Sequence, residues 1–128
     1  MNKKIIASGA LLGALAIVLG AFGAHALKKI LTIEELSTFE TGVKYQMYHA
    51  LFLLFIGTST LLNEKTKKTI FYLVSVGVLF FSGSIYFLAT NRLTSFDFKT
   101  IGFITPIGGL LLILAWMALF FNILKKKA

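Results

Sequence analysis

The sequence predicts an all-α membrane protein: an antiparallel bundle of four transmembrane helices, with a short interfacial amphipathic helix between the first two. Of its 128 residues, 57% are hydrophobic, which is too apolar for an ordinary water-soluble domain. Four apolar runs approach or exceed the roughly 20 residues that a helix needs to cross a bilayer. They are too long for strands and lack alternation, and an open sheet edge cannot be satisfied in lipid. We therefore expect one integral membrane domain, residues 1–128, with spans near 5–27, 45–62, 69–90 and 101–124.

Composition excludes several kinds of chemistry. The chain contains no cysteine, which rules out disulfides, thiolate zinc sites and iron–sulfur clusters. Its formal net charge is +8, but the lysines flank apolar runs and form no basic surface interleaved with aromatic residues. The charge therefore indicates orientation in a membrane rather than binding of nucleic acid. No cofactor is expected, and membrane lipids are the expected partners.

The first apolar run carries a stripe of small residues at spacings of four, three, four and three. On a helix they fall along one face: Gly9, Gly13, Ala16, Gly20 and Gly23. In lipid, helices associate through close backbone contact, which small residues permit. We therefore expect this helix to lie at the centre of the bundle.

The same run has an alternative interpretation as a secretory signal. Lys3 and Lys4 precede it, and Ala24-His25-Ala26 is typical of a cleavage site. The run is longer than the roughly 7 to 15 residues of a signal core. Because a stripe of small residues also serves packing, we interpret the run as a retained helix.

Residues 32–44 predict the amphipathic helix, which lies at the interface and runs into the second span. Thr32 and Glu35 have the spacing of a capping box, and Gly42 is a candidate bend. Apolar residues recur at helical intervals: Ile33, Leu36, Phe39 and Val43. The alternative is a solvated connector. The later connections are expected to be a tight polar turn at Asn63–Lys68 and a longer loop at Asn91–Thr100.

The distribution of basic residues predicts that both termini are cytoplasmic. One side of the predicted bundle holds eight basic residues: Lys3, Lys4, Lys65, Lys67, Lys68, Lys125, Lys126 and Lys127. The first and third loops, on the other side, hold five. The side with more Lys and Arg is expected to face the cytoplasm.

Antiparallel threading brings the polar residues of the spans to one half of the bilayer, the outer one. These are His25, Tyr45, Gln46, His49, Ser82, Ser84, Tyr86 and Thr105, and Glu40 joins them only if the preceding helix folds back. Polar side chains at this depth are costly unless they face the bundle and pair, so a shared cluster is expected. The two histidines are candidate ligands or proton carriers, but without a nearby carboxylate we favour helix-to-helix hydrogen bonds and expect no metal site.

Two short stretches predict close packing in the third and fourth spans. Around Gly83, the serines of Ser82-Gly83-Ser84 are expected to bond back to helix carbonyls. Pro106 starts the fourth helix or, alternatively, kinks it beside a ligand cavity. Gly108 and Gly109 follow as further small packing residues.

Four stretches carry a family resemblance: GAFGAHAL (Gly20–Leu27), FETGVKYQMYHAL (Phe39–Leu51), FSGSIYFL (Phe81–Leu88) and TPIGG (Thr105–Gly109). In them the chain resembles the family of small four-span membrane proteins of unknown function that includes the bacterial YgdD and YwdK proteins, with relatives in eukaryotes. The stretches touch all four predicted spans in order. The resemblance implies a multi-pass protein of the bacterial cytoplasmic membrane, with no established enzymatic activity and no assigned catalytic residues.

Because the informative residues are packing residues, we expect a non-enzymatic protein that supports the cell envelope by binding lipid, a partner protein or its own copies. The alternative is an oligomeric channel, or a small-solute or proton transporter, whose vestibule is the outer polar cluster. A serine nucleophile needs an activating base and an oxyanion site, and we can assemble neither. No catalytic residue is therefore predicted.

Overall fold

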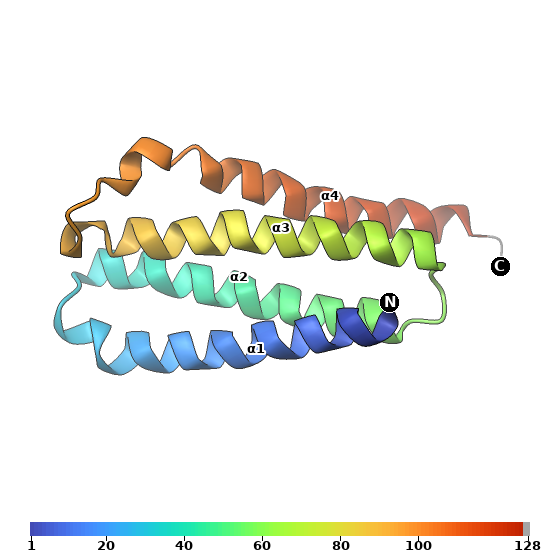
Figure 1. Cartoon of the computed structure of the whole chain (residues 1–128), viewed down its shortest axis with the longest axis horizontal. Helices are drawn as coiled ribbons and strands as arrows, with labels where there is room; N and C mark the ends of the chain where they lie inside the picture. Colours follow the sequence, from blue (N-terminus) through green and yellow to red (C-terminus); the bar gives the residue numbers. More distant parts are fainter. Residues whose placement is uncertain (127–128) are drawn as a thin grey trace.

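The computed structural model describes residues 1–126, which form helices and connecting segments without a strand. The long helices are α1 (Asn2–His25), α2 (Ile33–Thr58), α3 (Glu64–Ala89) and α4 (Ile104–Lys125). Each runs opposite to the one before it (Figure 1). Short 3-10 helices lie in the connections: η1 (Leu27–Lys29), η2 (Asn91–Leu93) and η3 (Phe98–Ile101). The all-helical prediction is confirmed for these residues, and Lys127, which entered the charge count, lies outside them.

A capping box starts α2. The Thr32 hydroxyl accepts a hydrogen bond from the backbone N–H of Glu35 at 3.1 Å, and the Glu35 carboxylate accepts one from the N–H of Thr32 at 2.9 Å. The spacing of these two residues predicted this cap, which satisfies backbone N–H groups that have no partner inside the helix. The helix then runs through Gly42 to Thr58 as one element. The connector and the second apolar run are therefore continuous.

An asparagine starts α3 earlier than the sequence suggested. The side-chain oxygen of Asn63 accepts a hydrogen bond from the backbone N–H of Thr66 at 2.8 Å, a typical N-cap. Glu64 follows in the first turn, where a negative charge is favourable. The predicted turn at Asn63–Lys68 is therefore wrong, because residues 64–68 are helical and the connection is residues 59–63.

Proline occupies the first turn of α4. The helix begins at Ile104, so Pro106 is its third residue. The N–H groups of the first turn have no partner within the helix, so the missing N–H of proline costs nothing there. The arrangement fits a helix start rather than a kink, and Pro106 itself is exposed instead of packed between helices.

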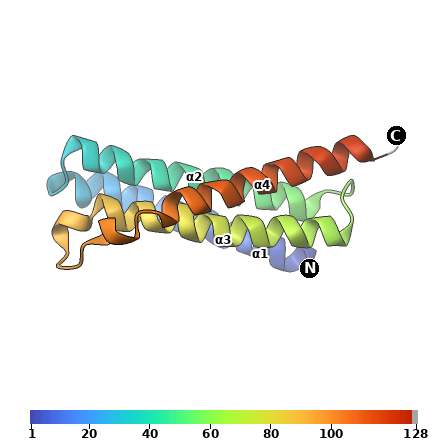
Figure 2. The same cartoon turned by 90° about the horizontal axis from the view of Figure 1, so that it is seen from above.

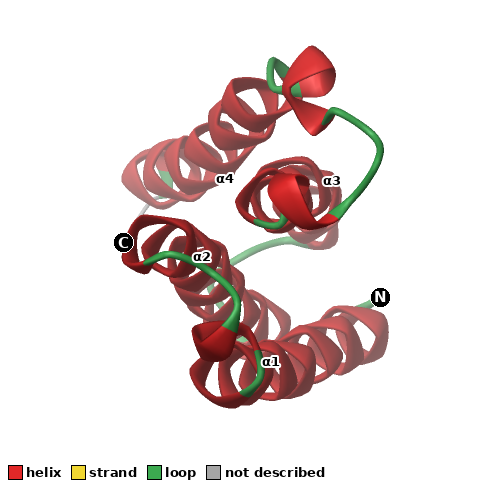
Figure 3. Cartoon of the chain, turned by 90° about the vertical axis from the view of Figure 1, so that its left-hand side faces the viewer, coloured by secondary structure: helices red, strands yellow, loops and turns green. Residues whose placement is uncertain are grey.

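The helices pack in chain order, α1 on α2, α2 on α3 and α3 on α4. Figure 3 shows this succession from one end of the molecule. Of the most apolar 18-residue window in each helix, 17% is buried inside the protein in α1 and in α4, against 39% in α3. The expectation that α1 is central is therefore wrong. It lies at the edge, because α2 alone covers its small-residue face.

The small residues of α1 lie against α2 over most of its length. A side chain at Gly9 would meet the Ala50 carbonyl oxygen at 2.8 Å, and one at Gly23 would meet the Phe39 ring at 3.1 Å. Between them, Ala16 is 1% exposed, while Gly13 and Gly20 have more room. The stripe therefore seats a single neighbouring helix.

Helices α3 and α4 approach each other closely at Gly108. A Cβ atom there would lie 2.7 Å from the backbone carbon of Phe80 and 2.9 Å from the carbonyl oxygen of Gly77, both on α3. Gly109 lies beside the Phe81 ring, at 3.5 Å from the same kind of added atom. Gly83 is different, since the nearest atom, from Leu79 of its own helix, is 4.0 Å away. Gly83 is therefore no helix-packing position.

Within residues 1–126, three helical segments are long and apolar enough to cross a membrane, Asn2–Lys29, Glu64–Ala89 and Phe98–Lys125. The remaining helix, α2, is equally long but contains Lys44, Gln46 and His49, which lower its hydropathy. Many large apolar side chains of α1 and α4 are exposed on the outside of the molecule. This is expected where lipid rather than water surrounds the helices, because in lipid such side chains gain nothing from burial.

The molecule has two ends of different character (Figures 1 and 2). The start of α1, the connection 59–63 and the end of α4 lie at one end, here called the lysine end. The end of α1, the start of α2 and the connection 90–103 lie at the other, here called the Arg92 end. This placement groups the basic residues as the antiparallel threading predicted.

Candidate functional site

A glutamine links three helices in the interior. The Tyr86 hydroxyl of α3 donates to Gln46 Oε1 of α2 at 2.6 Å, and Gln46 Nε2 donates to the Leu12 carbonyl oxygen of α1 at 2.8 Å. Gln46 is 4% exposed. Gly42 makes room for the tyrosine, because a Cβ atom there would lie 2.7 Å from the Tyr86 ring. The buried amide is thus bonded through both of its polar atoms.

Hydroxyl groups link α3 to its two neighbours. Ser82 Oγ donates to the Gly42 carbonyl oxygen of α2 at 2.8 Å. The Ser84 and Thr105 hydroxyls bond to each other between α3 and α4, and Ser84 Oγ also donates to the Phe81 carbonyl oxygen at 3.1 Å. Within residues 1–126, every fully buried side-chain nitrogen or oxygen atom has a hydrogen-bond partner. The interior polar side chains therefore form hydrogen bonds with one another or with backbone carbonyl groups.

Both ring nitrogens of His49 are engaged. Nδ1 lies 2.7 Å from the Tyr45 carbonyl oxygen, and Trp116 Nε1 donates to Nε2 at 3.0 Å. A carbonyl only accepts and an indole N–H only donates, so this geometry requires a neutral imidazole with its proton on Nδ1. The Trp116 indole also stacks on Phe52, with centroids 4.0 Å apart. As placed, His49 links α2 to α4 and has no nitrogen left for a metal.

Three of the predicted cluster residues lie elsewhere. His25, the last residue of α1, is exposed, and the last turn of α1 is level with Phe39, as the contact at Gly23 indicates. His49 is further along α2 by about 15 Å at 1.5 Å per residue. The expectation that the two histidines share a cluster is therefore wrong.

Glu40 and Tyr45 are the other two predicted cluster residues that lie outside the cluster. The Glu40 side chain is exposed and lines a surface pocket with Ala24 and Lys28 near the end of α1. Tyr45 is 41% exposed and lies beside the Phe81 ring, with centroids 5.1 Å apart. Among residues 1–126, no group of three or more His, Asp or Glu is arranged to hold a metal ion.

An ion pair joins the two connections at the Arg92 end. Arg92 Nη2 donates to Glu35 Oε1 at 2.8 Å and Nε donates to Oε2 at 3.1 Å, while Nη2 also donates to the Ile30 carbonyl oxygen at 2.7 Å. The hydrogen bond from Arg92, followed by that from the Thr32 backbone, lowers the pKa of Glu35 to about 2. Sequence reasoning assigned Glu35 only a capping role. The negative charge of Glu35 in the first predicted loop and the positive charge of Arg92 in the third were the only sequence features that could have indicated this ion pair.

A crevice runs between α2 and α4, and the sequence did not predict it. Trp116 reaches across it to α2 and divides it. Toward the lysine end lies an apolar hollow of about 460 Å³ whose walls include Phe55 of α2 and Phe120 and Leu124 of α4. On the other side of Trp116 lies a hollow of about 330 Å³, whose walls include Tyr45 and His49. We call the two hollows together the α2–α4 crevice. The larger hollow is lined almost entirely by apolar atoms, and the smaller one also by the polar groups of Tyr45 and His49.

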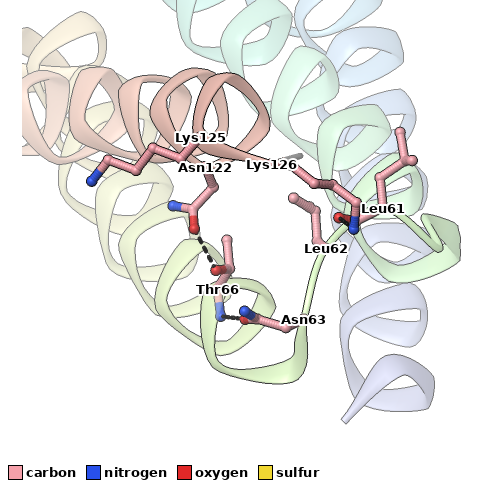
Figure 4. Close-up of a pocket in the computed structure, with 7 residues that line it drawn as sticks. All are labelled: Leu61, Leu62, Asn63, Thr66, Asn122, Lys125 and Lys126. Carbon is pink, nitrogen blue, oxygen red and sulfur yellow. Dashed lines mark hydrogen bonds between the residues drawn. The ribbon is translucent and has the colours of Figure 1, made fainter. Parts of the chain in front are cut away.

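A polar pocket of about 190 Å³ adjoins the crevice at the lysine end (Figure 4). Thr66 Oγ1 donates to Asn122 Oδ1 at 2.8 Å across its floor, between α3 and α4. Lys126 Nζ donates to the Leu61 carbonyl oxygen at 2.9 Å, and Lys125 and Asn63 also line the pocket. The sequence analysis used these lysines only for orientation. Lys126 reaches the connection 59–63, whereas the Lys125 side chain points the other way from the same end of α4 (Figure 4).

These features define the class of protein: a multi-pass α-helical membrane protein whose interior polar groups tie its helices together. A family model described as "Protein of unknown function (DUF423)" matches residues 19–109. The chain belongs to this family.

Named relatives cover nearly the whole chain. A UPF0382 membrane protein of Staphylococcus saprophyticus is 41% identical over 123 residues, 96% of this chain and 98% of its own length. The UPF0382 membrane protein YwdK of Bacillus subtilis is 37% identical, covering 90% of this chain and 91% of its own. The UPF0382 inner membrane protein YgdD of Escherichia coli is 30% identical, covering 98% and 93%. The resemblance to the YgdD and YwdK proteins is thus confirmed, and no solved structure matches the chain.

Proposed function

We propose that this protein is a non-enzymatic component of the bacterial cytoplasmic membrane that supports the envelope by holding a membrane lipid in the α2–α4 crevice. The observation that carries the proposal is the apolar hollow of about 460 Å³ between Phe55 of α2 and Phe120 of α4. Such a hollow, open to the bilayer, accommodates an acyl chain. Ligand sites in general are concave and mostly apolar, with polar groups placed at a few points.

The proposal includes a fourth span. At 26 residues, α2 is as long as α3. That is about 39 Å at 1.5 Å per residue, enough to cross a bilayer. Gln46 and His49, in the middle of α2, are each 4% exposed and so are withdrawn from lipid, whereas Lys44 nearby is exposed. With α2 spanning, only its first turns lie at the membrane–water boundary, where Glu34 is exposed.

The proposal also includes an orientation with both termini in the cytoplasm. The lysine end carries eight basic residues when Lys127 is counted, and the Arg92 end carries five. The more basic side of a multi-pass protein faces the cytoplasm. The polar pocket beside Lys126 then lies at the level of the cytoplasmic headgroups.

The alternative of a channel or transporter draws no support from the polar residues. Gln46, Ser82 and Tyr86 bond to neighbouring helices, so they act as links between helices. His49 is held in one tautomer by two partners. A vestibule would need such groups to face water instead.

The lipid proposal is tested by blocking the crevice. Leu124 lines the hollow and is 68% exposed, whereas Leu110, about 21 Å away along the same helix, is 56% exposed and lines neither hollow. Leu124→Trp fills the hollow, and Leu110→Trp adds the same bulk outside it. Native mass spectrometry of detergent-washed protein measures the lipid retained per chain.

We expect the wild type and Leu110→Trp to retain lipid and Leu124→Trp to lose most of it. Retention of no lipid by the wild type, or equal retention by the two variants, would overturn the proposal. Proton and ion flux in liposomes is the parallel measurement for the alternative, and a flux abolished by His49→Ala in a protein that still folds would favour it.

A further inference from the structure

We infer that the α2–α4 crevice selects an anionic phospholipid of the cytoplasmic leaflet, with its acyl chain in the apolar hollow and its phosphate in the polar pocket beside Lys126. This inference rests on the proposed function and names the class of its ligand. It is carried by the adjacency of the two cavities, which share Leu61 as a lining residue, and by the chemistry around that residue.

The cavities meet at Leu61. This residue, in the connection 59–63, lines both the apolar hollow and the polar pocket. Along α4 the hollow is lined from Trp116 to Leu124, and the pocket begins with Asn122, Lys125 and Lys126. The hollow thus follows about 12 Å of the helix axis before the wall becomes polar. An elongated ligand with an apolar tail and a polar head matches this order.

The pocket wall favours a negative charge. Lys126 Nζ has three N–H donors, and its recorded partner is one neutral acceptor, the Leu61 carbonyl oxygen. Lys125 also lines the pocket, with its ammonium group pointing away from that of Lys126, and Asn63, Thr66 and Asn122 add neutral polar groups (Figure 4). Among residues 1–126 the ion pair present is the one between Arg92 and Glu35, at the opposite end of the molecule. The cationic charge at the pocket is therefore left for an anion from outside the chain.

The pocket is also large enough for a headgroup phosphate. Its volume of about 190 Å³ is several times the roughly 30 Å³ that one water molecule takes in the liquid. Neighbouring lysines at the same end raise the local positive potential: Lys3, Lys4, Lys65, Lys67 and Lys68. Anionic lipids of the cytoplasmic leaflet are attracted to basic residues at this depth. A soluble anion would match the pocket but not the apolar hollow.

The test compares lipids that differ only in their headgroup. Purified full-length protein is equilibrated with phosphatidylglycerol and phosphatidylcholine of identical acyl chains, and native mass spectrometry measures the ratio bound. For the wild type we expect a preference of about 30-fold for phosphatidylglycerol, from two lysines at the membrane surface. Lys125→Gln/Lys126→Gln should reduce the ratio to near one while total lipid retention persists.

Two further variants make the result specific. Lys3→Gln/Lys4→Gln removes the same charge from the same end but away from the pocket, so it should keep most of the preference. Asn122→Asp keeps the side-chain shape and places a carboxylate in the pocket wall, so it should lower the preference even if the double lysine variant fails to fold. Equal loss in Lys3→Gln/Lys4→Gln and Lys125→Gln/Lys126→Gln would mean general attraction to the lysine end and would overturn the site.

The outcomes separate this inference from the proposed function. If the wild type retains both lipids equally, the headgroup selection is wrong and the crevice remains a lipid site. If the wild type retains neither lipid, the proposed function fails and the inference fails with it. A preference for phosphatidylglycerol that Leu124→Trp abolishes would support both.

Discussion

The two ends of the molecule balance their charges differently. Among the described residues, the lysine end holds seven lysines and one acid, Glu64. The Arg92 end holds five basic residues and four acids, and its arginine forms a forked pair with Glu35. At the lysine end, Lys67 and Lys126 instead donate to neutral oxygen atoms of Asn2 and Leu61. Among the described residues, the Arg92 end therefore holds one ion pair within the chain, whereas the lysine end holds none.

The interior shows the same contrast. In the half toward the Arg92 end, hydrogen bonds from Gln46, Ser82 and Ser84 tie all four helices to their neighbours. In the half toward the lysine end, α2 and α4 line a hollow beyond Trp116. We call the half with these hydrogen bonds the closed half and the half with the hollow the open half, although the open half also contains buried apolar residues such as Ile5, Ile56 and Ile70. The open half is expected to determine what the protein binds.

The largest expected effect breaks the closed half at Gly108. An added Cβ atom would lie 2.7 Å from the backbone carbon of Phe80, which cannot move independently of α3. Gly108→Ala should therefore force α4 away from α3 and lower the free energy of unfolding by about 1–3 kcal/mol, as overpacking does. Equilibrium unfolding in detergent micelles, followed by circular dichroism, measures this.

Gly83→Ala is the matched control, because the nearest atom is 4.0 Å away. It should be neutral or stabilise the helix by up to about 1 kcal/mol. If Gly108→Ala is as stable as Gly83→Ala, α4 does not pack closely on α3 at Gly108. That result would contradict the distinction between a closed and an open half.

A second prediction compares two side-chain amides, one in each half. Gln46→Leu leaves the Tyr86 hydroxyl and the Leu12 carbonyl oxygen without their partner in the interior. It should cost about 1–2 kcal/mol. Asn122→Leu removes the bond to Thr66 at the exposed lysine end, where water and headgroups can replace it. That change should cost about 0.5 kcal/mol or less.

Unfolding in the same detergent measures both variants, and Tyr86→Phe completes a double-mutant cycle with Gln46→Leu. A coupling energy near zero would mean that the Tyr86–Gln46 bond is not formed in the membrane protein. Equal losses for Gln46→Leu and Asn122→Leu would remove the distinction between the two halves.

Local sequence patterns predicted the helices but not how many neighbours each one has. The capping box at Thr32 and Glu35 depends on residues three apart, so the sequence alone specified it. The stripe from Gly9 to Gly23 indicated close packing on one face, and that face does lie against α2. It carried no information about the opposite face of α1, so the helix was wrongly expected at the centre.

Tertiary geometry also explains why the candidate site was only partly foreseen. Antiparallel threading placed His25 and His49 in the same half of the bilayer, but about 15 Å along the axis separates their levels. Arg92 and Glu35 are 57 residues apart, so no periodicity connects them. The α2–α4 crevice exists because α4 packs on α3 and reaches α2 through Trp116, and no local spacing encodes that arrangement.

The smallest expected effect on stability sharpens the comparison at the Arg92 end. Arg92 is exposed and the Glu35 side chain is half-buried at the surface, so Arg92→Gln should change stability little at neutral pH. The substitution should instead change the titration of the Glu35 carboxyl group. The arginine is the main cause of the lowered pKa of Glu35, about 2 instead of 4.5, so the variant should raise that pKa toward 4.5. Lys99→Gln, on the same connection, should leave it unchanged.

The sign follows from linkage. A carboxylate whose pKa is lower in the folded protein adds stability above its unfolded pKa and loses it as the pH falls through the folded pKa. The wild type should therefore lose this contribution between about pH 4.5 and pH 2, and Arg92→Gln should show no such loss from Glu35. Carbon-13 NMR of the glutamate carboxyl groups measures the titration directly, with Glu34 as the internal reference. Titration of Glu35 near 4.5 in the wild type would mean that the two connections are not joined, and the Arg92 end would then be as open as the lysine end.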